Sequence, residues 1–174
     1  MTNINKSKTL SYILRHKPEE FSLKMDEFGW VLVKPLLTAV GITQEELDTI
    51  VTDDKKGRYQ YSLNKQSIRA TQGHSRSVIL DLENLLEVFT PVYHGTSKAA
   101  LTNIFENGLI PGSRQHVHMC YDLEQAKQTG GRHGKPVVLV IDVNTAIKDG
   151  VKFHKSSNGY VLSEHVPAKY VAIL

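Results

Sequence analysis

The run of residues 137–143, VVLVIDV, constrains the fold of this 174-residue chain more than any other stretch. It is apolar apart from Asp142 and mostly β-branched, which is the pattern of a strand that is central in its sheet. Shorter strands are predicted around Phe153, over 160–162 and over 170–173, with turn signals between them. The C-terminal part of the chain is therefore predicted to be rich in strands, with few helices.

Ahead of that run, the sequence predicts two further strands, each followed by a helix. A strand over residues 92–96 ends in a glycine turn, after which Ser97 is expected to cap a helix that Gly108 terminates. Residues 115–120 form the next strand, and Asp122 caps a short helix behind it.

Three short helices and a hairpin are predicted in the N-terminal part. Residues 8–15 carry apolar side chains at helical spacing. Residues 35–41 begin with proline and end with glycine, as many helices do, and a capping box at 43–46 begins the third helix. Residues 59–70 then form a hairpin around a polar turn. This order is that of a winged-helix unit.

The chain is expected to form two domains of an α+β protein. Residues 77–89 are mostly apolar and acidic without glycine or proline, so they do not distinguish strand from helix. We place the boundary at Thr90-Pro91, which gives domains of residues 1–90 and 91–174.

Composition narrows the classes of function. The chain lacks an apolar run long enough to cross a bilayer, and its first residues lack the apolar core of a signal peptide. The single cysteine, Cys120, excludes an internal disulfide, so we expect a cytoplasmic protein. The net charge is only +3, with 12 basic and 12 acidic residues in 1–90 but 9 and 6 in 91–174, which mildly favours a polyanionic ligand such as a nucleotide or RNA.

Residues 68–75, IRATQGHS, have the composition of an anion site. Arg69 offers a rigid fork of donors that matches phosphate or carboxylate. Gly73 permits close approach of a ligand or a positive φ, and His74 and Ser75 add donors. The alternative is a polar loop after a hairpin strand.

Two further candidates also have structural explanations. Arg15 and His16 stand at the end of a predicted helix, where cations are favoured by the helix dipole whether or not they bind a ligand. The tripeptide His94-Gly95-Thr96 ends a strand and could hydrogen-bond a ribose or an amide, with Gly95 permitting close approach of the ligand. It could also serve only as a strand-to-helix turn. No glycine-rich dinucleotide fingerprint and no P-loop is present.

A metal site is not expected. His116 and His118 share a face of the predicted strand, but no third or fourth ligand accompanies them. Arg114, just before this pair, is by itself an ordinary surface arginine.

Together, residues 10–18, 68–75, 93–96 and 113–119 resemble the RNA 2′-phosphotransferases, NAD-dependent enzymes that remove an internal 2′-phosphate from RNA. The four motifs occur in the right order, and the resemblance covers nearly the whole chain. It implies a winged-helix lobe that binds RNA, joined to an ADP-ribosyltransferase-like lobe that binds NAD as co-substrate. A monomer without metal is expected.

The resemblance also implies roles for individual residues. The catalytic set, which would grip the 2′-phosphate and the NAD pyrophosphate, falls on Arg15, His16, Arg69 and Arg114. The NAD-binding set is His94, Gly95 and Thr96 on the nicotinamide side, with His118 as a second contact. Substrate phosphate would also meet Gln72, Gly73, His74 and Ser75. Residues 69–75 are expected at the junction of the two lobes.

The implied reaction has two steps. The 2′-phosphate attacks the anomeric carbon of NAD and expels nicotinamide, and the adjacent ribose hydroxyl then attacks phosphorus, releasing 2′-OH RNA and ADP-ribose 1″,2″-cyclic phosphate. ADP-ribosyltransferases that modify proteins use a late glutamate, where this chain has residues 160–162, YVL. A phosphate nucleophile is already ionised and needs no general base. If the alignment with those enzymes were shifted, Glu164 would instead occupy the position of their catalytic glutamate.

Two other functions compete with this one. The first step alone would cap terminal phosphates of RNA or DNA with ADP-ribose. A winged-helix nucleic-acid-binding protein with a degenerate second lobe is the non-enzymatic alternative, but it would not explain His94-Gly95-Thr96 or Arg114.

Overall fold

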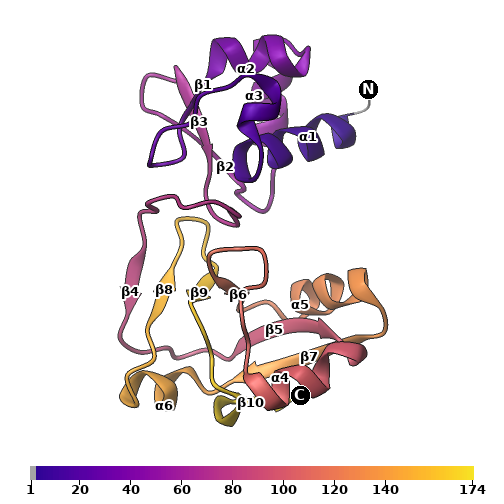
Figure 1. The fold of residues 1–174 in the computed structure, drawn as a ribbon, viewed down its shortest axis with the longest axis vertical. Helices are drawn as coiled ribbons and strands as arrows, with labels where there is room; N and C mark the ends of the chain where they lie inside the picture. The colour runs from indigo at the N-terminus through magenta and orange to yellow at the C-terminus, as the bar shows by residue number, and fades with distance from the viewer. Residues whose placement is uncertain (1–2) are drawn as a thin grey trace. The chain divides into compact units, whose positions relative to one another are not determined.

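A computed structural model describes residues 3–174 of the chain and, except at positions 3, 4 and 133, their side chains. The described residues combine helices with antiparallel sheets, as the sequence predicts for an α+β protein (Figure 1). They divide into two units, the first ending at Asp81 and the second running from Leu82 to Leu174.

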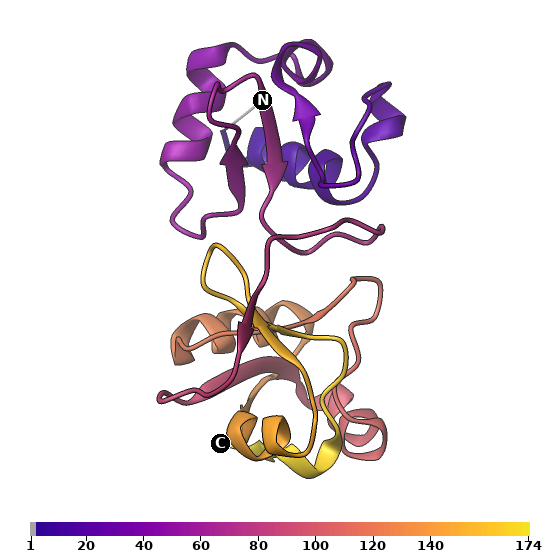
Figure 2. The ribbon, with the colours of Figure 1, turned by 90° about the vertical axis from the view of Figure 1, so that its left-hand side faces the viewer.

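The first unit surrounds a three-stranded antiparallel sheet with helices. Its strands are ordered β1-β3-β2, so β3 lies in the middle (Figure 2). The elements are α1 (Asn3–Arg15), η1 (Pro18–Phe21), β1 (Val31–Leu32), α2 (Val33–Val40), α3 (Gln44–Thr52), β2 (Tyr59–Tyr61) and β3 (Ser67–Ala70). The three predicted helices and the hairpin are confirmed, and α1 begins before the predicted residue 8.

Local chemistry explains where these helices begin and end. Thr43 and Glu46 form a complete capping box at the start of α3, each side chain bonding the other's backbone N–H. Gly41 ends α2 in the left-handed conformation at φ 69°. The apolar faces enclose a core of Leu10, Ile13, Leu14, Leu36, Leu47 and Ile68, all 0% exposed.

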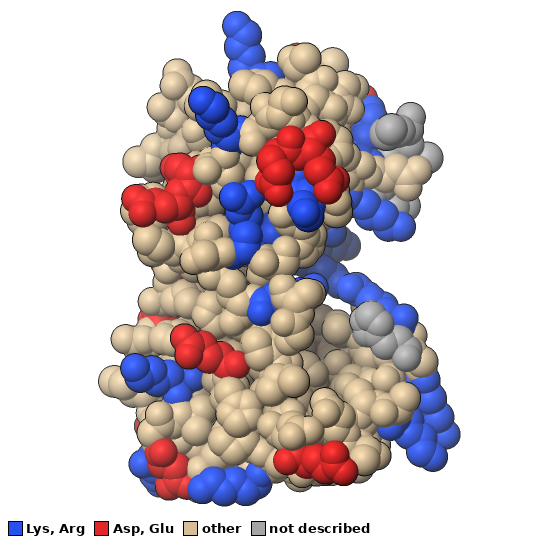
Figure 3. Space-filling view, in the orientation of Figure 1, with Lys and Arg blue, Asp and Glu red and all other residues tan. Residues whose placement is uncertain are grey.

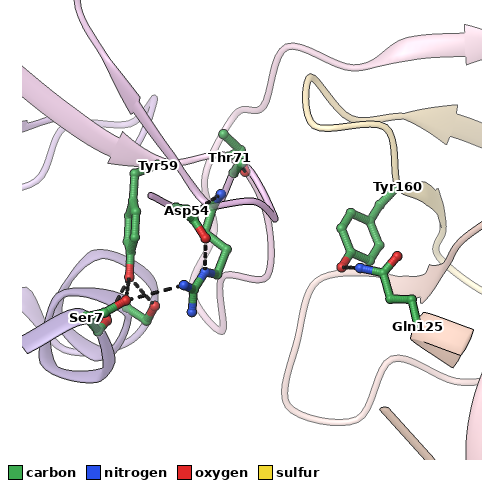
Figure 4. Close-up of polar contacts among 9 residues, drawn as sticks. Ser7, Asp54, Tyr59, Thr71, Gln125 and Tyr160 are labelled. Atoms are coloured by element: carbon green, nitrogen blue, oxygen red, sulfur yellow. Dashed lines mark hydrogen bonds and ion pairs between the residues drawn. The ribbon is translucent and has the colours of Figure 1, made fainter. Parts of the chain in front are cut away.

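Tyr59 joins the sheet to α1 (Figure 4). Its hydroxyl donates to the carbonyl of Ser7 at 2.7 Å and lies 2.7 Å from the Ser11 hydroxyl. The Arg58 guanidinium bonds the Ser7 hydroxyl at 3.3 Å and the Asp54 carboxylate at 2.8 Å. One polar cluster therefore fixes the helix against the hairpin.

Replacing Tyr59 with phenylalanine is expected to lower the free energy of unfolding by about 1–2 kcal/mol, because the buried partners of the hydroxyl lose a hydrogen bond while the ring still packs. Urea denaturation measures the change. Tyr12→Phe is the control, since the Tyr12 hydroxyl bonds Glu20 on the surface and its loss should change the stability little. Equal effects of the two substitutions would contradict the assignment.

The second unit contains two antiparallel sheets. One has the order β10-β7-β5 and the other β4-β8-β9-β6. The strands are β4 (Glu83–Leu85), β5 (Val92–Ser97), β6 (Val117–Met119), β7 (Pro136–Ile141), β8 (Phe153–Lys155), β9 (Val161–Ser163) and β10 (Val171–Ile173); the helices are η2 (Lys98–Ala100), α4 (Leu101–Asn107), α5 (Leu123–Gly130), η3 (Gly131–His133), α6 (Val143–Lys148) and η4 (Ala168–Tyr170). The apolar run does form the central strand of its sheet, and α5 packs along it and along β5 (Figure 1).

The structure also differs from the sequence predictions around Ser97, around Asp142 and within residues 77–89. The Ser97 side chain makes no capping hydrogen bond, and α4 begins only at Leu101 after a 3-10 turn. Asp142 ends the strand early because its carboxylate caps α6, which the sequence did not predict. Within the ambiguous residues 77–89, β4 pairs with β8, so the second unit begins at Leu82, whereas the sequence placed the boundary at Thr90-Pro91.

The second unit has its own apolar core. Its most buried members include Val92, Leu139, Phe153, Val161 and Val166, none more than 1% exposed. Across residues 3–174, every helix is too short or too polar to cross a membrane.

Candidate functional site

The end of α1 meets the segment that follows β3. The carbonyl of Arg15 accepts the backbone N–H of Ser75 at 3.0 Å, and the His16 ring lies 2.9 Å from the Ser75 hydroxyl through Nδ1. These bonds place the predicted Arg-His pair beside the predicted phosphate segment, within the first unit.

Gly73 makes that approach possible. It has φ +86°, a conformation that residues with a Cβ rarely adopt. A Cβ built at this position would stand 3.5 Å from the Arg15 guanidinium. The glycine predicted to admit a ligand therefore also lies against Arg15.

His74 is buried in the middle of this group. It is 1% exposed, and neither ring nitrogen has a hydrogen-bond partner among the described residues. Burial first, and then the positive charges of Arg15, His16, Arg69 and Arg76, lower its pKa to about 4. The ring is therefore neutral at pH 7, and the arginines around it carry the positive charge of the site.

The depressed pKa makes the stability of the protein dependent on pH. Above pH 6.5 the histidine is neutral whether the chain is folded or unfolded. Between pH 6.5 and about 4 the unfolded chain binds the additional proton, so as much as about 3 kcal/mol of stability is lost as the pH falls through this range. A proton NMR titration of the His74 ring should show no protonation at pH 6, and a midpoint near 6.5 would contradict the burial.

Arg69 lies on the central strand with a neighbour on either side. Gln60 is its partner in β2, and extending the register of β1 by one residue places Trp30 opposite it on the other side. Gln60 Oε1 accepts from Nε at 3.1 Å and from Nη2 at 3.0 Å. The Trp30 ring stacks on the guanidinium, with its centroid 4.4 Å from Cζ.

Arg69 is also ion-paired, which the sequence did not predict. Its Nη2 donates to the Asp81 carboxylate at 2.5 Å, and its Nη1 donates to the carbonyl of Phe28 at 3.3 Å. The register of the hairpin could have identified Gln60. Trp30 depends on a pairing between distant strands, and no sequence signal identifies Asp81.

The loop before His74 is buried, not a solvated polar loop. Thr71 bonds the main chain of Gly57 and Arg58 at 2.8 and 3.0 Å, and it is 8% exposed. Gln72 is 5% exposed, and its side-chain oxygen has no hydrogen-bond partner among the described residues. A buried amide oxygen of this kind costs free energy unless a donor meets it.

In the second unit, His94 and His118 come together. His94 Nδ1 lies 2.9 Å from the carbonyl of His118. Because a carbonyl only accepts, Nδ1 carries the proton, and Nε2 of the neutral ring is left as the acceptor. Burial lowers the pKa of His94, and the bond to the carbonyl opposes that shift. This ring can therefore accept a hydrogen bond from a hydroxyl or an amide.

Gly95 and Thr96 have a clear structural role. A Cβ at Gly95 would lie 1.8 Å from the carbonyl oxygen of Ala126, and a Cβ at Gly130 would lie 2.4 Å from that of Thr96. The sequence predicted that Gly95 allows a ligand to approach. The described structure shows that it allows the backbone of α5 to approach.

Tyr160 packs beside His118. Its ring stands edge-on to His118 at 6.4 Å, and its hydroxyl accepts from the Gln125 side chain at 2.5 Å (Figure 4). Neither residue was predicted to be near the site, although Tyr160 lies in the YVL segment that the alignment placed opposite the protein-modifying glutamate. Glu164, the alternative, is exposed just beyond β9.

Arg114 precedes β6 in a turn in which its backbone N–H donates to the carbonyl of Pro111 at 3.2 Å. The pKa of Arg114 is lowered, mainly because its guanidinium is desolvated and also because Arg132 repels it. His116 lies just outside β6. Its pKa is lowered mainly by burial and, to a smaller extent, by the charge of His154. Through residues 3–174, no group of three or more His, Cys, Asp or Glu side chains is arranged to hold a metal ion.

The predicted residues therefore form two groups. Arg15, His16, Arg69, Gln72, Gly73, His74 and Ser75 lie in the first unit, and His94, Gly95, Thr96, Arg114 and His118 in the second. The face in Figure 3 mixes basic with acidic side chains, in line with the small net charge (Figure 3). Anion binding must therefore come from local clusters such as the one around His74.

Comparison with known proteins identifies a family for the whole chain. Residues 1–165 match the model of the RNA 2′-phosphotransferase, Tpt1 / KptA family. The chain is 42% identical over 172 residues to a probable RNA 2′-phosphotransferase of Acaryochloris marina, covering 94% of this chain and 93% of that protein. Proteins of the same name from Fusobacterium nucleatum and Streptomyces coelicolor are 41% and 42% identical, covering 93% and 95% of this chain and 93% and 92% of their own lengths.

Proposed function

The chain belongs to the RNA 2′-phosphotransferase, Tpt1 / KptA family, and from this premise we propose that it removes an internal 2′-phosphate from RNA by transferring it to the ADP-ribose part of NAD. The observation that carries the proposal is the cluster around His74. Three arginines and His16 surround a buried neutral ring there, and such a cluster suits a dianionic phosphate.

In the first step, a 2′-phosphate oxygen attacks the anomeric carbon of the nicotinamide-bearing ribose, and the bond to nicotinamide breaks. Arg15, His16 and Arg69 would hold the phosphate, and Arg114 the pyrophosphate. Most of the acceleration would come from positioning, because the nucleophile is already ionised and nicotinamide is a cationic leaving group. Nε2 of His94 supports the proposal because it can accept from a ribose hydroxyl or the nicotinamide amide.

In the second step, the adjacent 2″-hydroxyl of ADP-ribose attacks the phosphorus and loses its proton. The bond between phosphorus and the RNA 2′-oxygen breaks, and that oxygen takes up a proton. The products are RNA with a 2′-hydroxyl and ADP-ribose 1″,2″-cyclic phosphate. Charge accumulates on the phosphoryl oxygens, where fixed guanidinium groups stabilise it.

We also propose that the first unit is a winged-helix lobe that binds RNA and the second an ADP-ribosyltransferase-like lobe that binds NAD. The order of three helices and a hairpin supports the first assignment. The pairing of His94 with His118 beside β5 and β6 supports the second. A cytoplasmic monomer that requires no metal remains our expectation.

The test is incubation with NAD and an RNA that bears one internal 2′-phosphate. Nicotinamide, 2′-OH RNA and the cyclic phosphate should appear in equal amounts, also in the presence of EDTA. A 5′-phosphorylated strand without the 2′-phosphate tests terminal capping in a parallel reaction. If only the capped strand formed, or if RNA bound without consumption of NAD, the proposal would be wrong.

A further inference from the structure

Arg69 already holds an anion, the carboxylate of Asp81. A guanidinium has five N–H donors, and four hydrogen bonds are present: two to Gln60, one to the Phe28 carbonyl and one to Asp81 at 2.5 Å. Only the last of these partners is charged.

The neutral partners fix the guanidinium from three directions. Gln60 accepts a hydrogen bond from Nε, and the carbonyl of Phe28 accepts one from Nη1. The Trp30 ring covers one face of the guanidinium, with its centroid 4.4 Å from Cζ. The Arg69 side chain is 5% exposed, and a buried cation is costly without an anion beside it. These contacts hold the N–H groups of the guanidinium in a fixed position. Because the cation is buried, it requires an anion at the N–H groups that remain.

Asp81 is held much less firmly than Arg69. Its side chain is 79% exposed, and the ion pair with Arg69 is the one interaction found for it within the described residues. A carboxylate and a phosphate can both accept hydrogen bonds from a guanidinium through two oxygens. An exposed carboxylate with one contact can therefore leave when a phosphate arrives.

We propose that Asp81 is an internal occupant of the anion site on Arg69, that the 2′-phosphate of the substrate displaces it, and that this competition sets the affinity of the site. The identity of the phosphate ligand rests on the proposed function. Asp81 shields the charge of Arg69 in the free protein. It therefore lowers the affinity of every anion that binds at this site by the same factor. Because the carboxylate of the pair is 79% exposed, we expect a factor of about fivefold.

The single tryptophan provides a local probe, because Trp30 stacks on the guanidinium. Adenosine 2′-monophosphate is titrated into the full chain, with binding followed by Trp30 fluorescence and by calorimetry. Asp81→Ala should lower the dissociation constant about fivefold, and Asp81→Asn should lower it less, because the amide oxygen still accepts a hydrogen bond. Glu27→Gln removes an exposed carboxylate that forms no ion pair within the described part of the chain, and it should leave the dissociation constant unchanged.

The sign of the effect decides the proposal. If Asp81 served to position Arg69, Asp81→Ala would weaken binding, as Gln60→Ala is expected to do. Weaker or unchanged binding in Asp81→Ala therefore overturns the inference, and so does calorimetric binding without a change in Trp30 fluorescence.

Turnover separates this inference from the proposed function. With 2′-phosphorylated RNA and NAD, Asp81→Ala should lower the KM for RNA while kcat changes less than about twofold. An active wild-type enzyme whose Asp81→Ala variant binds no tighter would refute the inference alone. The opposite outcome is a wild-type protein without transferase activity whose Asp81→Ala variant nevertheless binds adenosine 2′-monophosphate more tightly. That outcome would refute the proposed function but would still establish the competition at Arg69.

Discussion

Arg69→Lys is expected to lower kcat/KM for the removal of the 2′-phosphate by about a hundredfold to a thousandfold, with the protein still folded. Lysine keeps the positive charge but has no planar fork, so it cannot bond Gln60 and a phosphate edge together. Its ammonium would also lose the stacking on Trp30. Single-turnover kinetics with saturating NAD measure the change.

The choice of lysine follows from the burial of Arg69. Arg69→Ala would also be expected to abolish turnover. At 4% exposure and with four hydrogen bonds, however, the alanine variant would leave buried partners unsatisfied and would lose stability too. Arg58→Lys is the matched control, because Arg58 lies in the same unit outside the cluster around His74 and pairs with Asp54, as a lysine can also do. If both lysine variants lost activity equally, Arg69 would have no special role.

Elements that depend on local patterns were predictable. The capping box at Thr43, the hairpin that ends in β3 and the central strand β7 all follow from short-range chemistry, and the structure contains each of them. The environment of the site depends on distant contacts. Trp30 reaches Arg69 because β1 pairs with β3, and no local pattern specifies that pairing.

Residue types alone did not specify the environment of three site residues. A polar segment after a hairpin is usually solvated, yet Gln72 and His74 are buried because the main chain returns against α1. Gly95 was assigned to a ligand because glycine permits close approach, and the sequence does not specify what approaches. In the structure it is a helix of the same unit.

Gly95→Ala is expected to destabilise the second unit by about 4 kcal/mol or more, an effect in the range reserved for severe packing conflicts. The added methyl group would stand 1.8 Å from the carbonyl oxygen of Ala126 and 2.6 Å from its carbon. Both atoms belong to the backbone of α5, so no side-chain rotation relieves the clash. A Cβ at Gly130 on the same helix would likewise lie 2.4 Å from the carbonyl oxygen of Thr96. Urea unfolding followed by circular dichroism measures the loss.

Gly131→Ala is the control because it adds the same methyl group one residue beyond α5. Gly131 has φ −64°, and no atom lies within 4 Å of its Cβ position. There, alanine should change stability by less than about 1 kcal/mol, and in the stabilising direction, since it restricts the unfolded chain. A Gly95→Ala protein as stable as this control would mean that β5 and α5 do not meet through their glycines, and the tripeptide His94-Gly95-Thr96 would need another structural explanation.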